Sequence, residues 1–137
     1  AMERLNREPH LIQAAGEGWE FEEIGFREGT RVVRDRNLPT DTILCSNDRL
    51  AIGFLSAAYE AGVLVGLGEG CTMRVAGHDN HPFSRYTCPT LTTVSQDYEA
   101  IARKSAETLM ALIEAETPAD SRTETLFDGR LVMRGSA

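Results

Sequence analysis

Three stretches of the chain, residues 22–36, 48–61 and 97–116, carry apolar side chains at helical spacing. In each stretch these side chains recur every three or four positions and so gather on one face of an α-helix. The positions that share such faces are Phe21, Ile24, Gly25, Glu28 and Val32; Ala51, Phe54, Leu55 and Ala58; and Ile101, Ser105, Leu109, Leu112 and Ile113. We therefore predict three helices, of which the third would be about 30 Å long.

Short apolar or β-branched segments between these helices predict strands at residues 42–45, 71–77 and 90–94. The later stretch "TETLFDGRLVMRG" predicts strands around a turn at Asp128-Gly129. Strands that alternate with long helices indicate parallel pairing through right-handed crossovers. The 137 residues therefore suit a single α/β domain built on a mostly parallel sheet.

Composition excludes several classes of protein. The net charge is −7 and the pI is about 4.9, which argues against a surface that grips nucleic-acid phosphates. Arginines cluster over residues 27–36, but Glu28 and Asp35 alternate with them, which is typical of a solvated helix face. The 3 cysteines form no C-x-x-C pair, so we expect a reducing cytoplasm and place Cys45, in its apolar run, in the core. No run of about 18 apolar residues and no secretory signal pattern occurs in the sequence.

Polar residues stand where two of the predicted strands end. Asn47 follows "TILCS", and Asp79 follows "MRVAGH". In open α/β sheets, ligands bind in the crevice beyond the carboxyl ends of the strands. An amide that donates and accepts, beside a carboxylate that accepts, suits a molecule with adjacent hydroxyls. The alternative is that such residues serve as turns and caps, as we expect of Asp48 before the second helix and Gly62 after it.

Beyond these local signals, three longer segments of the chain resemble a known protein family. The segments are "PTDTILCSNDRLAIGFLSAAYEAG", "RVAGHDNHPFSRYTCPTLTTVSQDYEAIARKSAETLMALI" and "LVMRGS". They contain N-D-x-x-A-x-G, G-x-D and P-x-L-T-T-V-x-Q-D in this order, and from about residue 17 to the end the chain closely resembles the effector-binding core of the lac repressor (LacI/GalR) family of bacterial transcription regulators. The resemblance implies a three-layer, Rossmann-like lobe of the periplasmic binding protein-like I fold. Residues 1–137 would then form a single lobe for a sugar-like effector.

The resemblance also implies ligand-binding residues on the sheet edge. Asn47 and Asp79 match positions whose amide and carboxylate bind effector hydroxyls. Gln96 and Tyr98 match the segment that crosses between lobes, where the family places a polar contact and an aromatic ring on the ligand.

Three further positions near the start of the chain match the family's ligand contacts. Arg4 in "ERLNR" resembles an effector-binding arginine, although Arg7-Glu8 stands where the family has a Gly-aromatic pair. Trp19 and Phe21 both match an aromatic residue, near the start of the first helix, that contacts the ligand.

Two parts of the family pattern, the helix-turn-helix and the first lobe, have no counterpart in this sequence. We therefore expect a chain that senses an effector and reaches DNA only through the absent domain. The crossover helix, within residues 96–117, packs in the family on the first lobe, and exposing its stripe costs about 1.5–3 kcal/mol per large apolar side chain. We expect this helix to fold back onto the lobe or to pack against a second copy in a homodimer.

Two other functions stay open. The chain could be a dimerisation or interaction partner of a full-length regulator. Alternatively, His78, Asp79 and His81 could bind a metal or transfer protons, although as loop residues near a turn the histidines need no such role. His10 is the only other histidine, and "GLGEG" fits no phosphate-binding motif. We predict a binding protein that is not an enzyme and needs no metal or organic cofactor.

Overall fold

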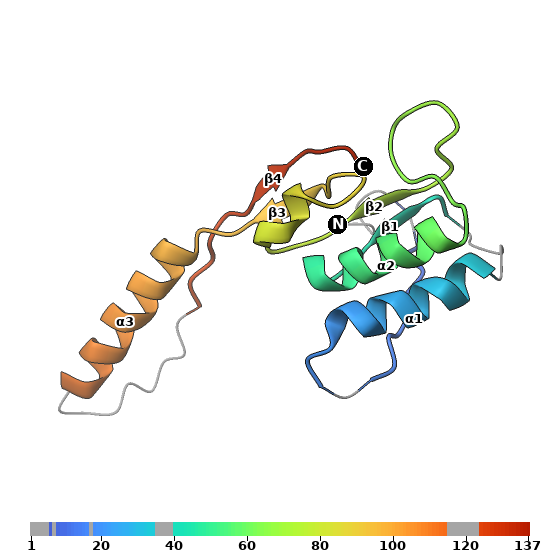
Figure 1. The fold of residues 1–137 in the computed structure, drawn as a ribbon. Coiled ribbons are helices and arrows are strands. Elements are labelled where there is room, and N and C mark those ends of the chain that lie inside the picture. Colours follow the sequence, from blue (N-terminus) through green and yellow to red (C-terminus); the bar gives the residue numbers. More distant parts are fainter. Residues whose placement is uncertain (1–5, 7, 17, 35–39, 115–123) are drawn as a thin grey trace.

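A computed structural model describes residue 6 and residues 8–16, 18–34, 40–114 and 124–137. Its elements follow the order that the sequence predicts, with helices between strands (Figure 1). They are α1 (Phe21–Arg34), β1 (Thr42–Leu44), α2 (Asp48–Glu60), β2 (Arg74–Ala76), the 3₁₀ helix η2 (Pro82–Arg85), β3 (Thr93–Ser95), α3 (Tyr98–Glu114) and β4 (Arg130–Val132). The predicted ends of the first helix at Arg36 and of the third at Glu116 lie outside the described residues.

The sheet is parallel where the alternation of strands and helices predicts it. β1 pairs with β2 in parallel, with Ile43 opposite Val75. A parallel bridge from Ala76 to Thr92 brings the segment that leads into β3 alongside β2. α1 and α2 lie together on one side of the β1–β2 pair (Figure 1). The α/β prediction is therefore confirmed.

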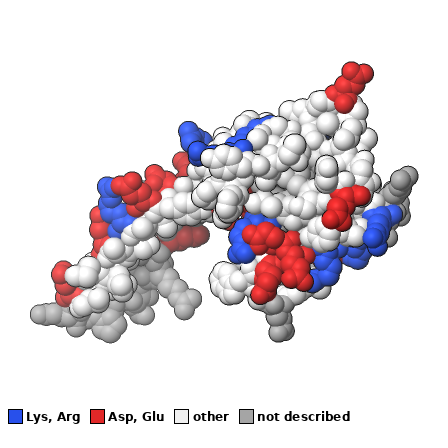
Figure 2. All heavy atoms as spheres, in the orientation of Figure 1, with Lys and Arg blue, Asp and Glu red and all other residues white. Residues whose placement is uncertain are grey.

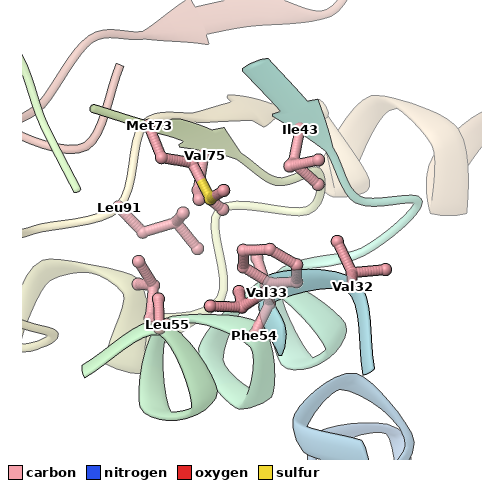
Figure 3. Close-up of a cluster of buried hydrophobic side chains, with 10 residues drawn as sticks. Val32, Val33, Ile43, Phe54, Leu55, Met73, Val75 and Leu91 are labelled. Carbon is pink, nitrogen blue, oxygen red and sulfur yellow. The ribbon is translucent and has the colours of Figure 1, made fainter. Parts of the chain in front are cut away.

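Apolar side chains from both helices and both parallel strands form one core (Figure 3). The predicted face of α2 is buried as expected, and Ile24 and Val32 of the predicted face of α1 are buried with it. Cys45 is half-buried and packs against this cluster, as its apolar surroundings predict. The buried members are Val32, Val33, Ile43, Ala51, Phe54, Leu55, Ala58, Met73, Val75 and Leu91. Each large side chain here contributes about 1.5–3 kcal/mol to stability.

The two helices approach so closely that glycines are required at their contact. A Cβ added at Gly53 would lie 2.0 Å from the carbonyl oxygen of Glu22. A Cβ at Gly25 would lie 2.2 Å from the carbonyl oxygen of Leu50. Gly62, at φ 69°, follows the end of α2 in the left-handed conformation that the sequence predicts.

The predicted turn at Asp128-Gly129 does not join two strands. Residues 124–129 form no strand, and β4 pairs antiparallel with β3, with Val94 opposite Leu131. A two-stranded hairpin on its own is at best marginally stable. β3 and β4 form a two-stranded sheet of their own, which is joined to β2 by the bridge from Ala76 to Thr92, and the N–H of Asp79 also donates to the carbonyl of Val94.

Helix α3 runs away from the rest of the molecule (Figure 1). None of its residues is buried, and its large apolar side chains Leu109, Met110, Leu112 and Ile113 are 52–69% exposed. The expectation that this helix folds back onto the lobe is therefore wrong. Strands β3 and β4 pair with each other, and α3 follows β3 on the side away from α1 and α2 (Figure 1).

Candidate functional site

Two loops meet beyond the ends of β1 and β2. The backbone N–H of Cys45 donates to the carbonyl of Ala76, and that of Asp48 donates to the carbonyl of His78 over 2.8 Å each. Asn47 precedes Asp48 and Asp79 follows His78, so both belong to one edge of the sheet. Neither is sealed in the core, since Asn47 is half-buried and the side chain of Asp79 is 39% exposed.

Asn47, and not Asp48, caps α2. The Oδ1 atom of Asn47 accepts a hydrogen bond of 2.8 Å from the backbone N–H of Leu50. Asp48 is fully buried, and its carboxylate accepts hydrogen bonds from His81 and Thr93 instead of from the first turn of α2. The expectation that Asp48 caps the helix is therefore wrong. The Nδ2 group of Asn47 has no hydrogen-bond partner among the described residues, so it can still donate to a ligand.

Asp79 carries a partly exposed carboxylate and is held in a strained backbone conformation, with φ at 112°. Its Oδ1 atom accepts a hydrogen bond of 3.2 Å from Nε2 of Gln96. The same atom lies 3.1 Å from Nδ1 of His78, which is itself 3.3 Å from the amide of Gln96. Three polar side chains thus converge, and the carboxylate keeps accepting positions for an incoming ligand.

Tyr98 closes the site from the first turn of α3. Its hydroxyl donates to the backbone carbonyl of Asp79 over 3.1 Å, and the residue is 52% exposed. Partial burial, together with the nearby carboxylates of Asp79 and Asp48, raises the pKa of Tyr98. The hydroxyl therefore stays protonated and the ring offers an uncharged surface beside Asp79.

Trp19 and Phe21 lie together before and at the start of α1. Their rings meet edge to face, with centroids 5.8 Å apart, and Trp19 is 78% exposed. The guanidinium of Arg49 lies 5.3 Å from the ring centre of Phe21 and makes two hydrogen bonds of 2.6 Å to Glu22. This pairing lowers the pKa of Glu22. Arg49 lies in the first turn of α2, so the aromatic pair is attached to the end of the helix that Asn47 caps.

Arg4, the remaining predicted contact, lies outside the described residues. The prediction that the arginines of α1 form a solvated helix face agrees with the structure. The side chains of Arg27 and Arg31 are more than half exposed, and both lie beside Glu28. Blue and red side chains accordingly lie next to one another over this helix in Figure 2.

The loop histidines have local structural partners. Nδ1 of His81 accepts from the backbone N–H of Phe83 and caps η2, whereas His78 faces Asp79 and Gln96. Within the described ranges, no three His, Cys, Asp or Glu side chains are grouped so that they could hold a metal ion. The metal-dependent alternative therefore gains no support from the geometry.

Sequence reasoning missed two polar residues that support this edge. Asp48 accepts from the backbone of His81, and Arg134 donates to Asn80. Both lie within matched family segments, yet their pattern does not tell which loop they would contact. Among the described residues no helix is long and apolar enough to cross a membrane.

Comparison with known proteins places the chain in a family. The periplasmic binding protein-like domain family matches residues 2–137. A probable HTH-type transcriptional repressor, ExuR of Bacillus subtilis, is 37% identical over 103 residues, which are 74% of this chain and 29% of that protein. The lactose operon repressor of Klebsiella pneumoniae is 34% identical over 95 residues, which are 69% of this chain and 25% of the repressor. The chain thus spans between a quarter and a third of these relatives.

Solved structures agree with the sequence relatives. A LacI family regulator from Arthrobacter, in complex with lactose, superposes with a TM-score of 0.68 at 30% identity, over 84% of this chain and 41% of that one. A putative LacI family regulator from Sanguibacter keddieii gives a TM-score of 0.73 at 32% identity, over 88% of this chain and 42% of that one. The chain belongs to the periplasmic binding protein-like domain family, among the effector domains of LacI-type transcription regulators.

Proposed function

We propose that this lobe binds a sugar-like effector at the edge formed by Asn47, Asp79, Gln96 and Tyr98. The observation that carries the proposal is the Asp79 carboxylate, which is partly exposed and accepts a hydrogen bond from Gln96 beyond the end of β2. A carboxylate accepts from two vicinal hydroxyls at once, and the Nδ2 group of Asn47 offers a donor on the same edge. A relative at 30% identity whose structure contains lactose supports this ligand class.

Aromatic rings favour a ligand with an apolar face, as sugars have. Tyr98 presents its ring next to Asp79, and the exposed ring of Trp19 with Phe21 lies at the neighbouring helix ends. Stacking on such rings adds apolar contact area without breaking the hydrogen bonds to the hydroxyls. Arg4 completes this proposed set.

At the level of the whole regulator, we propose that effector binding to this lobe changes the affinity of a DNA-binding domain for its operator, in the cytoplasm. Such a coupling needs two sites and a structural change that joins them. The lobe described here supplies the effector site.

A role in association is favoured by α3. Its apolar side chains Leu109, Met110, Leu112 and Ile113 are all more than half exposed, and contiguous exposed apolar surface marks interfaces. We propose that a second copy of the chain covers the stripe, since a two-fold arrangement buries identical stripes simultaneously. A first lobe of a full-length regulator is the competing cover.

Amide-resolved NMR during titration with lactose, and separately with sucrose, tests the effector site. We expect the signals of Asn47, Asp79 and Gln96 to shift with the sugar. Asp79→Ala should remove these shifts with little change in melting temperature, because the side chain lies at the surface.

Asp41→Ala is the matched control. Asp41 is also an exposed aspartate, 3.6 Å from Arg74, but it stands before β1 and not beyond its end. Sugar-induced shifts that persist unchanged in Asp79→Ala would refute the site, whereas loss in both variants would point to an unspecific charge effect.

A further inference from the structure

The loop that carries Asp79 is held in a conformation that it would not adopt alone. Asp79 and Asn80 both have positive φ angles, 112° and 52°. The φ of Asn80 lies in the left-handed region that asparagine tolerates, whereas 112° is costly for any residue other than glycine and persists only where the surroundings enforce it. The loop over residues 78–81 must therefore be held by neighbours, and two residues from distant parts of the chain do so.

Asp48 contacts the loop at both of its ends. Its backbone N–H donates to the carbonyl of His78 over 2.8 Å, and its Oδ2 atom accepts from the N–H of His81 over 2.7 Å. Its Oδ1 atom accepts from the hydroxyl of Thr93 over 2.6 Å, so the buried carboxylate has partners on both oxygens. A Cβ at Gly77 would lie 2.2 Å from Oδ1, which explains the glycine of the G-x-D signature.

Arg134 holds the middle of the loop from the C-terminal segment. One nitrogen of its guanidinium donates to Oδ1 of Asn80 over 2.7 Å. Another nitrogen donates to the hydroxyl of Ser84 over 2.9 Å and to the carbonyl of Leu91 over 2.7 Å. The planar fork of arginine can reach three such acceptors at once, which a lysine ammonium cannot do in the same directions.

We infer that Asp48 and Arg134 are positioning residues that hold loop 78–81 so that the carboxylate of Asp79 faces Gln96 and the carbonyl of Asp79 faces Tyr98. The consequence for effector binding rests on the proposed function. The positioning itself does not, since it concerns contacts within the lobe.

The ionisation of Tyr98 reports where the loop lies. Tyr98 donates to the carbonyl of Asp79, and its raised pKa arises from burial and from the nearby carboxylates of Asp79 and Asp48. If Arg134→Gln releases the loop, we expect the pKa of Tyr98 to fall toward the value of about 10 for a solvated tyrosine. Loss of a positive charge by itself would raise the pKa, so a fall indicates movement and not a direct charge effect.

The experiment is a tyrosine-resolved NMR titration of the whole chain, with Tyr98→Phe to assign the signal. Arg134→Lys keeps the charge but not the fork, and we expect it to behave as Arg134→Gln does. Arg74→Gln removes a half-exposed arginine elsewhere, beside Asp41, and should leave the pKa of Tyr98 unchanged.

Asn80→Ala guards the test against a variant that fails to fold. It removes the acceptor of Arg134 in the loop, together with the hydrogen bond of 3.4 Å that Nδ2 of Asn80 donates to the hydroxyl of Ser95. It should lower the pKa of Tyr98 and shift the amide signal of Asp79. An unchanged pKa in both folded Arg134→Gln and Asn80→Ala overturns the inference. Lactose titration of the same variants separates the two proposals: if the parent chain does not bind lactose, the effector site fails while the tyrosine readout still decides the positioning role.

Discussion

The backbone N–H of Asp48 lies 2.8 Å from the carbonyl oxygen of His78, and this bond joins the loop after β1 to the loop after β2. Because of it, Asn47 and Asp79, which are 32 positions apart in the sequence (79 minus 47), occupy one edge of the sheet. The polar residues that follow the two strands thus share a surface, as the position of strand ends in open α/β sheets requires.

Asn47 has two separable tasks, and two substitutions should distinguish them. Asn47→Ala removes the acceptor for the N–H of Leu50, and we expect a loss of about 0.5–2 kcal/mol in the free energy of unfolding, measured in urea. Asn47→Asp keeps an acceptor at the cap and should keep most of the stability, but it lacks the Nδ2 donor. We therefore expect Asn47→Asp to weaken lactose-induced NMR shifts while it melts like the parent. Equal lactose response in both proteins would assign Asn47 to capping alone.

The close contact between α1 and α2 predicts that one added methyl group at Gly53 lowers the stability of the protein strongly. In Gly53→Ala the new Cβ would meet the carbonyl oxygen of Glu22 at 2.0 Å, so the helices must move apart. We expect a loss of about 1–3 kcal/mol in unfolding free energy, as for other overpacked contacts. Gly68→Ala is the control, because the nearest atom to its Cβ, the sulfur of Cys71, lies 3.9 Å away. Similar stability of the two variants would mean that the helices are not packed as described.

The sequence predicts elements well where the period of apolar residues is strong. The stripe of α2, from Ala51 to Ala58, is buried as predicted, because helix period and core contact coincide there. The stripe of α3 is just as periodic, yet Leu109 is 58% exposed. The period of apolar residues indicates that one face of a helix is apolar, but it does not indicate which other part of the structure covers that face. Similarly, the turn signal at Asp128-Gly129 is local, whereas the pairing of β4 with β3 depends on a strand far away in the chain.

The site could be anticipated in outline and not in detail. Strand ends and family signatures point to Asn47 and Asp79, since both signals are local. The hydrogen bonds of Asp48 and Arg134 are not foreseeable from spacing, because they connect residues 33 and 54 positions apart. Asn47 and Asp48 are adjacent and both suit a cap, so only the backbone geometry decides that Asn47 accepts from Leu50.

The cysteines should differ sharply in reactivity. Burial, reinforced by the nearby carboxylate of Asp48, raises the pKa of Cys45 to about 12, so almost no thiolate exists near neutral pH. Cys88 is exposed. With iodoacetamide at about pH 8, we expect mass spectrometry to find Cys88 alkylated and Cys45 intact. Urea should expose Cys45 and make it react, and rapid alkylation of Cys45 without denaturant would contradict its place against the core.

The stripe on α3 makes the most direct prediction about assembly. If a second copy covers it, the chain should sediment as a dimer, and Leu109→Ser with Leu112→Ser should produce a monomer that keeps its helical circular dichroism. Both leucines are more than half exposed, so removing them costs the lone lobe little packing. Leu126→Ser is the control, because Leu126 is 86% exposed but lies outside α3. A parent chain that sediments as a monomer would exclude self-association and leave a first lobe as the cover, which binding of α3 to a separately purified first lobe of a relative would then test.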